Sequence, residues 1–189
     1  MKFFNTIFFL ALIAILFSGC KKGIPLFEEG KPDSWIQKGD AKWEFSNGEI
    51  KGTLLRGTGF LMTKEAYGDF ELQLEFYPDE TINSGVFVRC SVNKLSFSEC
   101  YEINIWDFHP EPNDRTGAIV SRTKPLVHLN TIDKWNTYKI KCAGNRIKAW
   151  LNEELIADVE DDDLEEGYIG LQAAGIGTIK FKNIVIKTE

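Results

Sequence analysis

The sequence has 189 residues, of which 43% are hydrophobic and 13% aromatic, enough for the packed core of one domain and too many for a disordered chain. The formal net charge of −6 argues against nucleic acids and anionic membrane surfaces as partners. No glycine-rich phosphate loop, clustered Cys/His metal pattern or serine nucleophile elbow is present. We therefore predict no nucleotide site, no zinc site and no serine-hydrolase triad.

The N-terminus has the features of a secretory signal. Lys2 precedes a nearly uninterrupted apolar run, residues 3–17, which is too short for a good membrane-spanning helix. Ser18 and Gly19 then precede Cys20, as small residues precede the lipidated cysteine of bacterial lipoproteins. We expect residues 1–19 to be a signal peptide and Cys20 to carry a lipid, which makes the protein an exported bacterial lipoprotein, membrane-anchored in the periplasm or at the cell surface. The alternative is ordinary cleavage, with no role for Cys20.

The next segment, residues 20–34, contains two glycines and two prolines and is predicted to be a linker, so the folded domain is expected at residues 35–189. The stretch WEFSNGEIKG (43–52) predicts a hairpin, because Asn47 and Gly48 both accept positive φ. The stretch FELQLEF (70–76) alternates apolar and polar residues with a period of two, which indicates a strand with one buried face.

Similar strand patterns continue to the C-terminus and no long stretch has a helical period. In the last of them the apolar parity switches, which predicts a β-bulge near Asn183. The acidic segment 158–167 lacks the ligand spacing of a calcium loop, so we interpret it as a solvated loop. Short strands at regular spacing predict an all-β protein, and aromatic residues on both faces favour two stacked sheets, one of them curved around a groove. The further strands are expected at residues 84–90, 101–107, 138–142, 146–152, 168–174 and 179–187.

The cysteines beyond Cys20 suggest two different environments. Cys90 and Cys100 flank a polar loop between two predicted strands, so a disulfide between them is geometrically feasible, and the sequence leaves it open. Cys142 continues the inward series of Tyr138 and Ile140 and is predicted to be a buried free thiol.

Seven motifs follow one another along the chain. They are LMTKEAYGDFELQLEF, NSGVFVR, YEINIWD, TGAIV, WNTYKIKCAGNRIKAWLNEELIAD, GYIGLQ and IKFKNIVIK. Together, in this order, they resemble the 3-keto-disaccharide hydrolase family, over about residues 35–187. The resemblance implies a concanavalin-A-like jelly-roll β-sandwich of two antiparallel sheets with a concave groove.

The resemblance also implies a reaction on glycosides or oligosaccharides already oxidised at C3. A ketone at C3 acidifies the C2 hydrogen, so a base removes that proton, an enolate forms and the C1 substituent leaves. Water then adds back, and the net result is hydrolysis. The protein must supply a base near C2, donors for the enolate oxygen, an acid for the leaving oxygen and an aromatic wall for the sugar.

Candidates for each role lie in the matched motifs. Glu102 or His109 is the expected base, and Arg89 and Asn83 are expected to bind the C3 oxygen. Asp107 would orient His109 or bind a hydroxyl. The remaining candidates for substrate contact are Trp106 as a stacking ring, Asn104 and Gln172. The family's usual residues at positions 104 and 106 are Gln and Leu, so fine specificity is expected to differ.

A register argument limits this assignment. If Cys90 and Cys100 pair directly across antiparallel strands, Val88 faces Glu102, and Arg89 and Glu102 point to opposite faces of the sheet. Both residues can then share one site only if a bulge or a shifted register intervenes.

Two other functions compete with the enzyme. Jelly rolls are often lectin-like, so a non-catalytic carbohydrate-binding lipoprotein is the main alternative. A retaining glycosidase needs two close carboxylates, and the chain has Asn104 and Trp106 where further acids would follow Glu102. We predict no cofactor, and rank a divalent metal at Glu102, Asp107 and His109 below the metal-free site.

Overall fold

The computed structural model describes residues 23–29, 34–91 and 98–188. Among these residues, none forms a helix long and apolar enough to cross a membrane. The predicted signal peptide and Cys20 lie outside the described residues. The described elements are β1 (Ile24–Pro25), β2 (Trp35–Gly39), β3 (Lys42–Ser46), β4 (Glu49–Leu54), β5 (Thr58–Thr63), β6 (Phe70–Pro78), β7 (Ile82–Cys90), β8 (Tyr101–Ile105), the 3-10 turn η2 (Pro112–Asp114), β9 (Asn136–Ala143), β10 (Arg146–Leu151), β11 (Glu154–Glu160), β12 (Tyr168–Gly175) and β13 (Gly177–Thr188).

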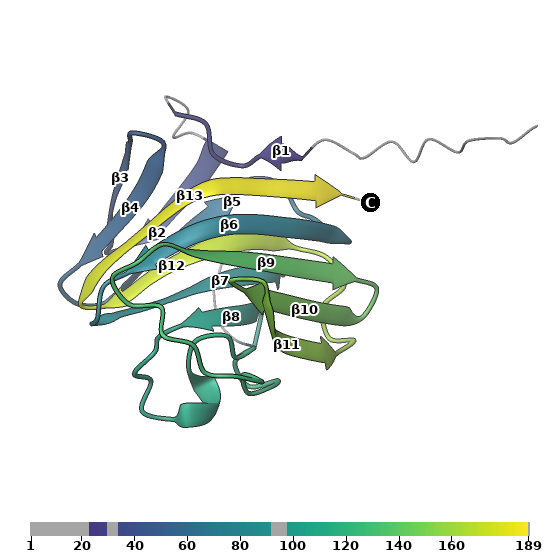
Figure 1. Cartoon of the computed structure of the whole chain (residues 1–189). Helices are drawn as coiled ribbons and strands as arrows, with labels where there is room; N and C mark the ends of the chain where they lie inside the picture. Colours follow the sequence, from purple (N-terminus) through teal and green to yellow (C-terminus); the bar gives the residue numbers. More distant parts are fainter. Residues whose placement is uncertain (1–22, 30–33, 92–97, 189) are drawn as a thin grey trace, which may run out of the picture.

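These strands form two stacked antiparallel sheets (Figure 1). One sheet has eight strands in the order β11-β10-β9-β6-β13-β4-β3, with β1 paired to β13, and the other has five in the order β2-β5-β12-β7-β8. Apolar side chains from one face of each sheet meet between them, including the fully buried Phe70, Leu72, Leu74 and Phe76 of β6. The predicted all-β sandwich is confirmed.

Local sequence signals are found where they were expected. The Asn47-Gly48 pair joins β3 to β4 with positive φ at both residues, 55° and 72°. In β13 the pairing with β6 shifts between Lys182 and Val185, where Asn183 has a φ of 51°. The shift is the predicted bulge, and it lets β13 bury Ile179 and Phe181 before it, and Ile184 and Ile186 after it.

Part of the expected linker is packed onto the sandwich. Ile24 and Pro25 pair with Ile186 and Val185, along the edge of β13 that β4 leaves open. Leu26 and Phe27 then pack against the core. The folded unit therefore includes residues 23–29, ahead of the boundary that we expected at Trp35.

The structure settles the disulfide that the sequence left open and confirms the buried free thiol. Cys90 and Cys100 form a disulfide between the end of β7 and the start of β8. Cys142 is a buried free thiol, and burial raises its pKa to about 12. The disulfide does not impose the direct register that we considered, because Phe87 rather than Val88 lies opposite Glu102. An extra residue is accommodated at Arg89, whose φ is 53°, and the pairing with β12 shifts at the same place.

Candidate active site

The candidate site lies on the face of the five-stranded sheet that is turned away from the core. On β8, Tyr101, Ile103 and Ile105 enter the core, so Glu102 and Asn104 occupy the opposite face. Cross-strand pairing places Phe87 beside Glu102, and Gly85 between Asn104 and Gln172. We call this surface the Glu102 face and define it by Phe60, Asn83, Gly85, Phe87, Glu102, Asn104 and Gln172.

The connection after β8 folds back along the free edge of that strand. Asn104 N donates to Ala118 O, Gly117 N donates to Asn104 O, and Val120 N donates to Glu102 O. Residues 117–120 therefore act as a further short strand beside β8. Glu102 is only 8% exposed although it does not point into the main core.

Gly85 makes room for the Glu102 side chain. A Cβ atom at position 85 would lie 2.9 Å from Glu102 Oε1 and 3.2 Å from its Cγ. The Glu102 side chain therefore lies across the face, above the backbone of β7. A glycine inside a strand weakens the strand, and here it allows the close approach of a carboxylate.

The environment of Glu102 favours its neutral form. Burial raises the pKa of this carboxyl to about 7, and the negative charge of Asp114 adds to the effect. A carboxyl with this pKa is balanced between its two protonation states near neutral pH. That property suits a general base or acid, whereas a surface glutamate would be a weaker base.

Two amide side chains on the same face have unsatisfied polar atoms. Asn83 Oδ1 and Gln172 Oε1 are both buried, and no group among the described residues hydrogen-bonds to either. Asn83 lies opposite Ala174 and Gln172 lies opposite Gly85, so the two amides are diagonal neighbours across β7 and β12. A buried polar atom without a partner costs roughly 1–3 kcal/mol, and a bound polar ligand would remove that cost.

Asn104 and Asp107 have structural partners instead of free polar groups. Asn104 Nδ2 donates to the backbone oxygen of Asp114, and its Oδ1 accepts from Ile105 N. Asp107 accepts from Thr116 Oγ1 and from both the backbone and the hydroxyl of Thr131. Both side chains thus fix the connection between β8 and β9. These contacts give both residues a structural role, and their expected role in substrate binding stays a prediction.

His109 lies past the end of β8 within the same connection. Its Nδ1 is 3.0 Å from both the backbone N and the backbone O of Glu111. Its ring meets Trp106 edge-on, with 4.5 Å between the ring centroids. Asp107 makes its hydrogen bonds elsewhere, so it does not orient His109 as we expected. Trp106 and His109 form a half-buried aromatic pair at the end of the strand.

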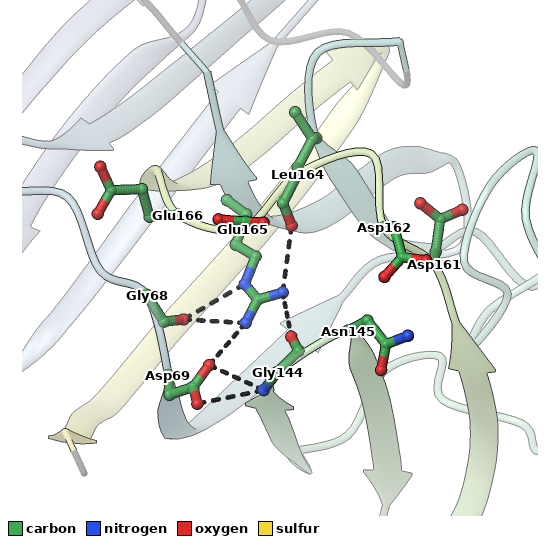
Figure 2. Close-up of a pocket in the computed structure, with 10 residues that line it drawn as sticks. Gly68, Asp69, Gly144, Asn145, Asp161, Asp162, Leu164, Glu165 and Glu166 are labelled. Carbon is green, nitrogen blue, oxygen red and sulfur yellow. Dashed lines mark hydrogen bonds and ion pairs between the residues drawn. The ribbon is translucent and has the colours of Figure 1, made fainter.

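Arg89 belongs to a different part of the molecule, so its assignment to the Glu102 site is wrong. Its guanidinium donates to the backbone oxygens of Gly68, Gly144 and Leu164 and forms an ion pair with Asp69 at 2.9 Å (Figure 2). The side chain is 1% exposed and borders a cavity of about 370 Å³ that is lined mostly by acidic residues and backbone. The bulge at Arg89 turns the Arg89 side chain toward this cavity.

The metal alternative is not supported by the geometry. Within the described parts of the chain, no group of three or more His, Cys, Asp or Glu side chains lies close enough together to hold an ion. Glu102, Asp107 and His109 therefore do not form a ligand set.

Two contributors to the site were missed from the sequence. Gly85 lies inside the matched NSGVFVR motif, and a glycine in a strand interior is a recognisable signal of close backbone approach. Asp114 lies in the irregular connection after β8, where no periodicity indicates which residues return to the sheet.

Comparison with known proteins places the fold and the family. Solved structures similar to this chain include a candidate glycosyl hydrolase from Parabacteroides distasonis, with 26% identity, a TM-score of 0.76, and coverage of 89% of this chain and 100% of that chain. The carbohydrate-binding module CBM66 from Bacillus subtilis has 17% identity, a TM-score of 0.64, and coverage of 82% and 96%. The β-glucanase of Bacillus licheniformis has 13% identity, a TM-score of 0.63, and coverage of 90% and 99%.

These last two likenesses show the fold, and they confirm the expected concanavalin-A-like jelly roll. Among curated proteins, no sequence matches this chain significantly. Residues 22–187 match the 3-keto-alpha-glucoside-1,2-lyase-like domain, which covers nearly all of the described structure. The chain therefore belongs to the 3-keto-alpha-glucoside-1,2-lyase-like domain family.

Proposed function

We propose that the protein cleaves 3-keto-glycosides, such as 3-keto-disaccharides, and that Glu102 is the base that removes the C2 proton. The observation that carries the proposal is the state of Glu102, a carboxyl that is 8% exposed and whose pKa is raised to about 7. Membership of the lyase-like family supports the substrate class. The likeness to a candidate glycosyl hydrolase supports glycoside cleavage in general.

The proposed reaction uses one carboxylate and balances without a cofactor. The C2–H bond breaks and its proton passes to Glu102, while the electron pair forms the enolate of the C3 ketone. Collapse of the enolate expels the C1 oxygen substituent, which takes a proton and departs as an alcohol. Water then adds a hydroxyl to C1 and a proton to C2, which completes a net hydrolysis. Stabilising the enolate is the step for which preorganised donors matter most.

Asn83 and Gln172 are the proposed donors to the keto sugar. Each presents a side-chain amide to the Glu102 face, and each has an amide oxygen without a protein partner. An amide carries an NH₂ donor beside its oxygen, and the two groups exchange places by a rotation of the side chain. The pair therefore replaces Arg89 and Asn83 as the proposed contacts of the C3 oxygen and its neighbours. Trp106 remains a candidate for the aromatic wall, and Phe60, on the Glu102 face, is a second one.

Glu102 is preferred to His109 as the base. The Glu102 carboxyl lies on the same face as the two amides, above Gly85. His109 lies beyond the strand end, where its Nδ1 is held by Glu111 and its ring by Trp106. A residue that removes a proton from C2 must share the surface that binds the sugar.

Turnover of a substrate panel tests the proposal. The purified protein is incubated with matched disaccharides, with and without oxidation at C3, and the released sugar is quantified. We expect release from the oxidised sugars alone, its loss in Glu102→Gln, and its retention in Glu154→Gln, which removes an exposed carboxylate from β11. Equal turnover by the wild type and Glu102→Gln would remove Glu102 as the base.

A non-catalytic carbohydrate-binding protein is the second candidate, because unsatisfied amides on a sheet face suit sugar binding as well as turnover. Calorimetric titration with the same panel separates the two functions. Saturable binding of unoxidised sugars without any product would favour the binding protein.

Export and lipidation at Cys20 also remain proposals. Metabolic labelling with a radioactive or alkyne-bearing fatty acid should mark the wild type and not Cys20→Ser. Equal labelling of both would overturn the lipid anchor.

A further inference from the structure

Asp114 is held beside Glu102 by several contacts of the connection after β8. Asn104 Nδ2, on the Glu102 face, donates to the backbone oxygen of Asp114. Residues 117–120 then pair with β8 along Asn104 and Glu102. The C-terminal end of η2 is thus fixed to β8, at the edge of that strand away from β7, whereas Asn83 and Gln172 lie on β7 and β12.

The Asp114 carboxyl is half-buried and accessible from solvent. It borders an open hollow of about 280 Å³ together with Asn113 and the turn at residues 121–124. Asp114 is therefore not in a sealed interior. Its backbone oxygen accepts from Asn104, a residue of the Glu102 face, so Asp114 lies next to that face.

The charges that act on Glu102 are few. The neighbours from β7, Gly85 and Phe87, do not titrate, and residues 117–120 include no titratable side chain. In the described residues, Asp114 is the one charged group that perturbs the titration of Glu102, and like charge makes ionisation harder.

We propose that Asp114 is a second functional carboxylate of this site, a positioning residue that acts on the reaction through Glu102. The inference rests on the proposed function for its catalytic consequence. Repulsion from Asp114 makes the Glu102 carboxylate a stronger base, and transfer of the C2 proton to Glu102 relieves that repulsion. Asp114 thus favours movement of negative charge from Glu102 to the enolate of the substrate.

A charge-removing variant with a matched control tests the inference. Asp114→Asn removes the charge and keeps the backbone oxygen that Asn104 uses, and Asp162→Asn removes an equal charge from an exposed loop elsewhere. The titration of the Glu102 carboxyl is followed by ¹³C NMR, with Glu102→Gln to assign the signal. We expect the pKa of Glu102 to fall by roughly half a unit or more in Asp114→Asn and to stay unchanged in Asp162→Asn.

The pH–rate profile provides the catalytic readout. In Asp114→Asn the acid limb of kcat/KM should move to lower pH by the same amount, and the plateau should fall by about twofold because the base is weaker. Asp114→Glu, which keeps the charge, should restore most of the wild-type profile. A merely structural role would lower the plateau without moving the acid limb, and that result would overturn the inference.

The test distinguishes failure of the inference from failure of the proposed function. If the wild type cleaves no 3-keto-glycoside, the proposed function fails, and the NMR titration still decides the role of Asp114. If Asp114→Asn does not fold, the wild type is titrated at low and high salt, because salt screens a like charge and should lower the pKa of Glu102. A Glu102 titration that changes neither with salt nor in Asp114→Asn overturns the inference.

Discussion

Replacing Glu102 by Gln is expected to stabilise the protein while it abolishes turnover. In the folded state the pKa of Glu102 is raised from 4.5 to about 7, so ionised Glu102 opposes folding. The difference of 7 − 4.5 = 2.5 pKa units corresponds to about 3 kcal/mol, at about 1.4 kcal/mol for each unit. Gln has the shape of the protonated acid and carries no charge, so it avoids this cost.

The size of this stabilisation depends on pH. Above pH 7, Glu102 is ionised in both states and the whole cost is present. Between pH 7 and pH 4.5 the folded protein holds a proton that the unfolded chain releases, so the cost disappears as the pH falls. The advantage of Glu102→Gln should therefore be about 3 kcal/mol at pH 8 and near zero below pH 4.5.

Urea denaturation of the wild type, Glu102→Gln and Glu154→Gln at pH 8, 6 and 4.5 measures this dependence. Glu154 is exposed, so its variant should follow the wild type at every pH. If Glu102→Gln is less stable than the wild type at pH 8, or if its advantage does not change with pH, the raised pKa and its assigned cause are refuted.

Three further predictions concern Gly85, Arg89 and the disulfide. Gly85→Ala should reduce turnover at least tenfold and lower the stability by about 1–3 kcal/mol, because the added Cβ would press on Glu102. Steady-state kinetics and urea denaturation measure the two effects. Arg89→Met should destabilise the fold by about 3–5 kcal/mol, since it leaves buried carbonyl groups without donors, and a cleavage rate per folded molecule that fell to zero would contradict its structural assignment. Replacing Cys90 and Cys100 by Ser should cost about 3 kcal/mol in urea denaturation, as expected for a short closed loop, and an unchanged midpoint would be the contrary result.

The sequence was a good guide to features that depend on local chemistry. Asn47-Gly48 predicted its turn because both residues tolerate positive φ, and the alternation from Phe70 to Phe76 predicted which face of β6 is buried. The parity switch near Asn183 predicted a bulge. In each case the signal lies within a few neighbouring residues.

The site was predicted less completely, because its side chains are arranged by long-range contacts. The alternation of apolar and polar residues around Glu102 predicted the sheet face on which its side chain lies. The order of the motifs then made that face a candidate site. The family motif placed Arg89 with Glu102. The bulge at Arg89 turns its side chain away from the face that Phe87 and Glu102 share, and no local pattern marks the bulge. Asp107 looked like a free carboxylate because its partner Thr131 is 24 residues away in the sequence.

Exchange of the C2 hydrogen with solvent tests the central claim most directly. A 3-keto-disaccharide is cleaved in D₂O, and deuterium at C2 of the released keto sugar is measured by mass spectrometry at early times, against a sample without enzyme. The wild type should release a product that carries deuterium at C2, and Glu102→Gln should give no enzymatic incorporation. Rapid cleavage by the wild type with the original hydrogen retained at C2 would contradict proton abstraction and point to direct displacement at C1.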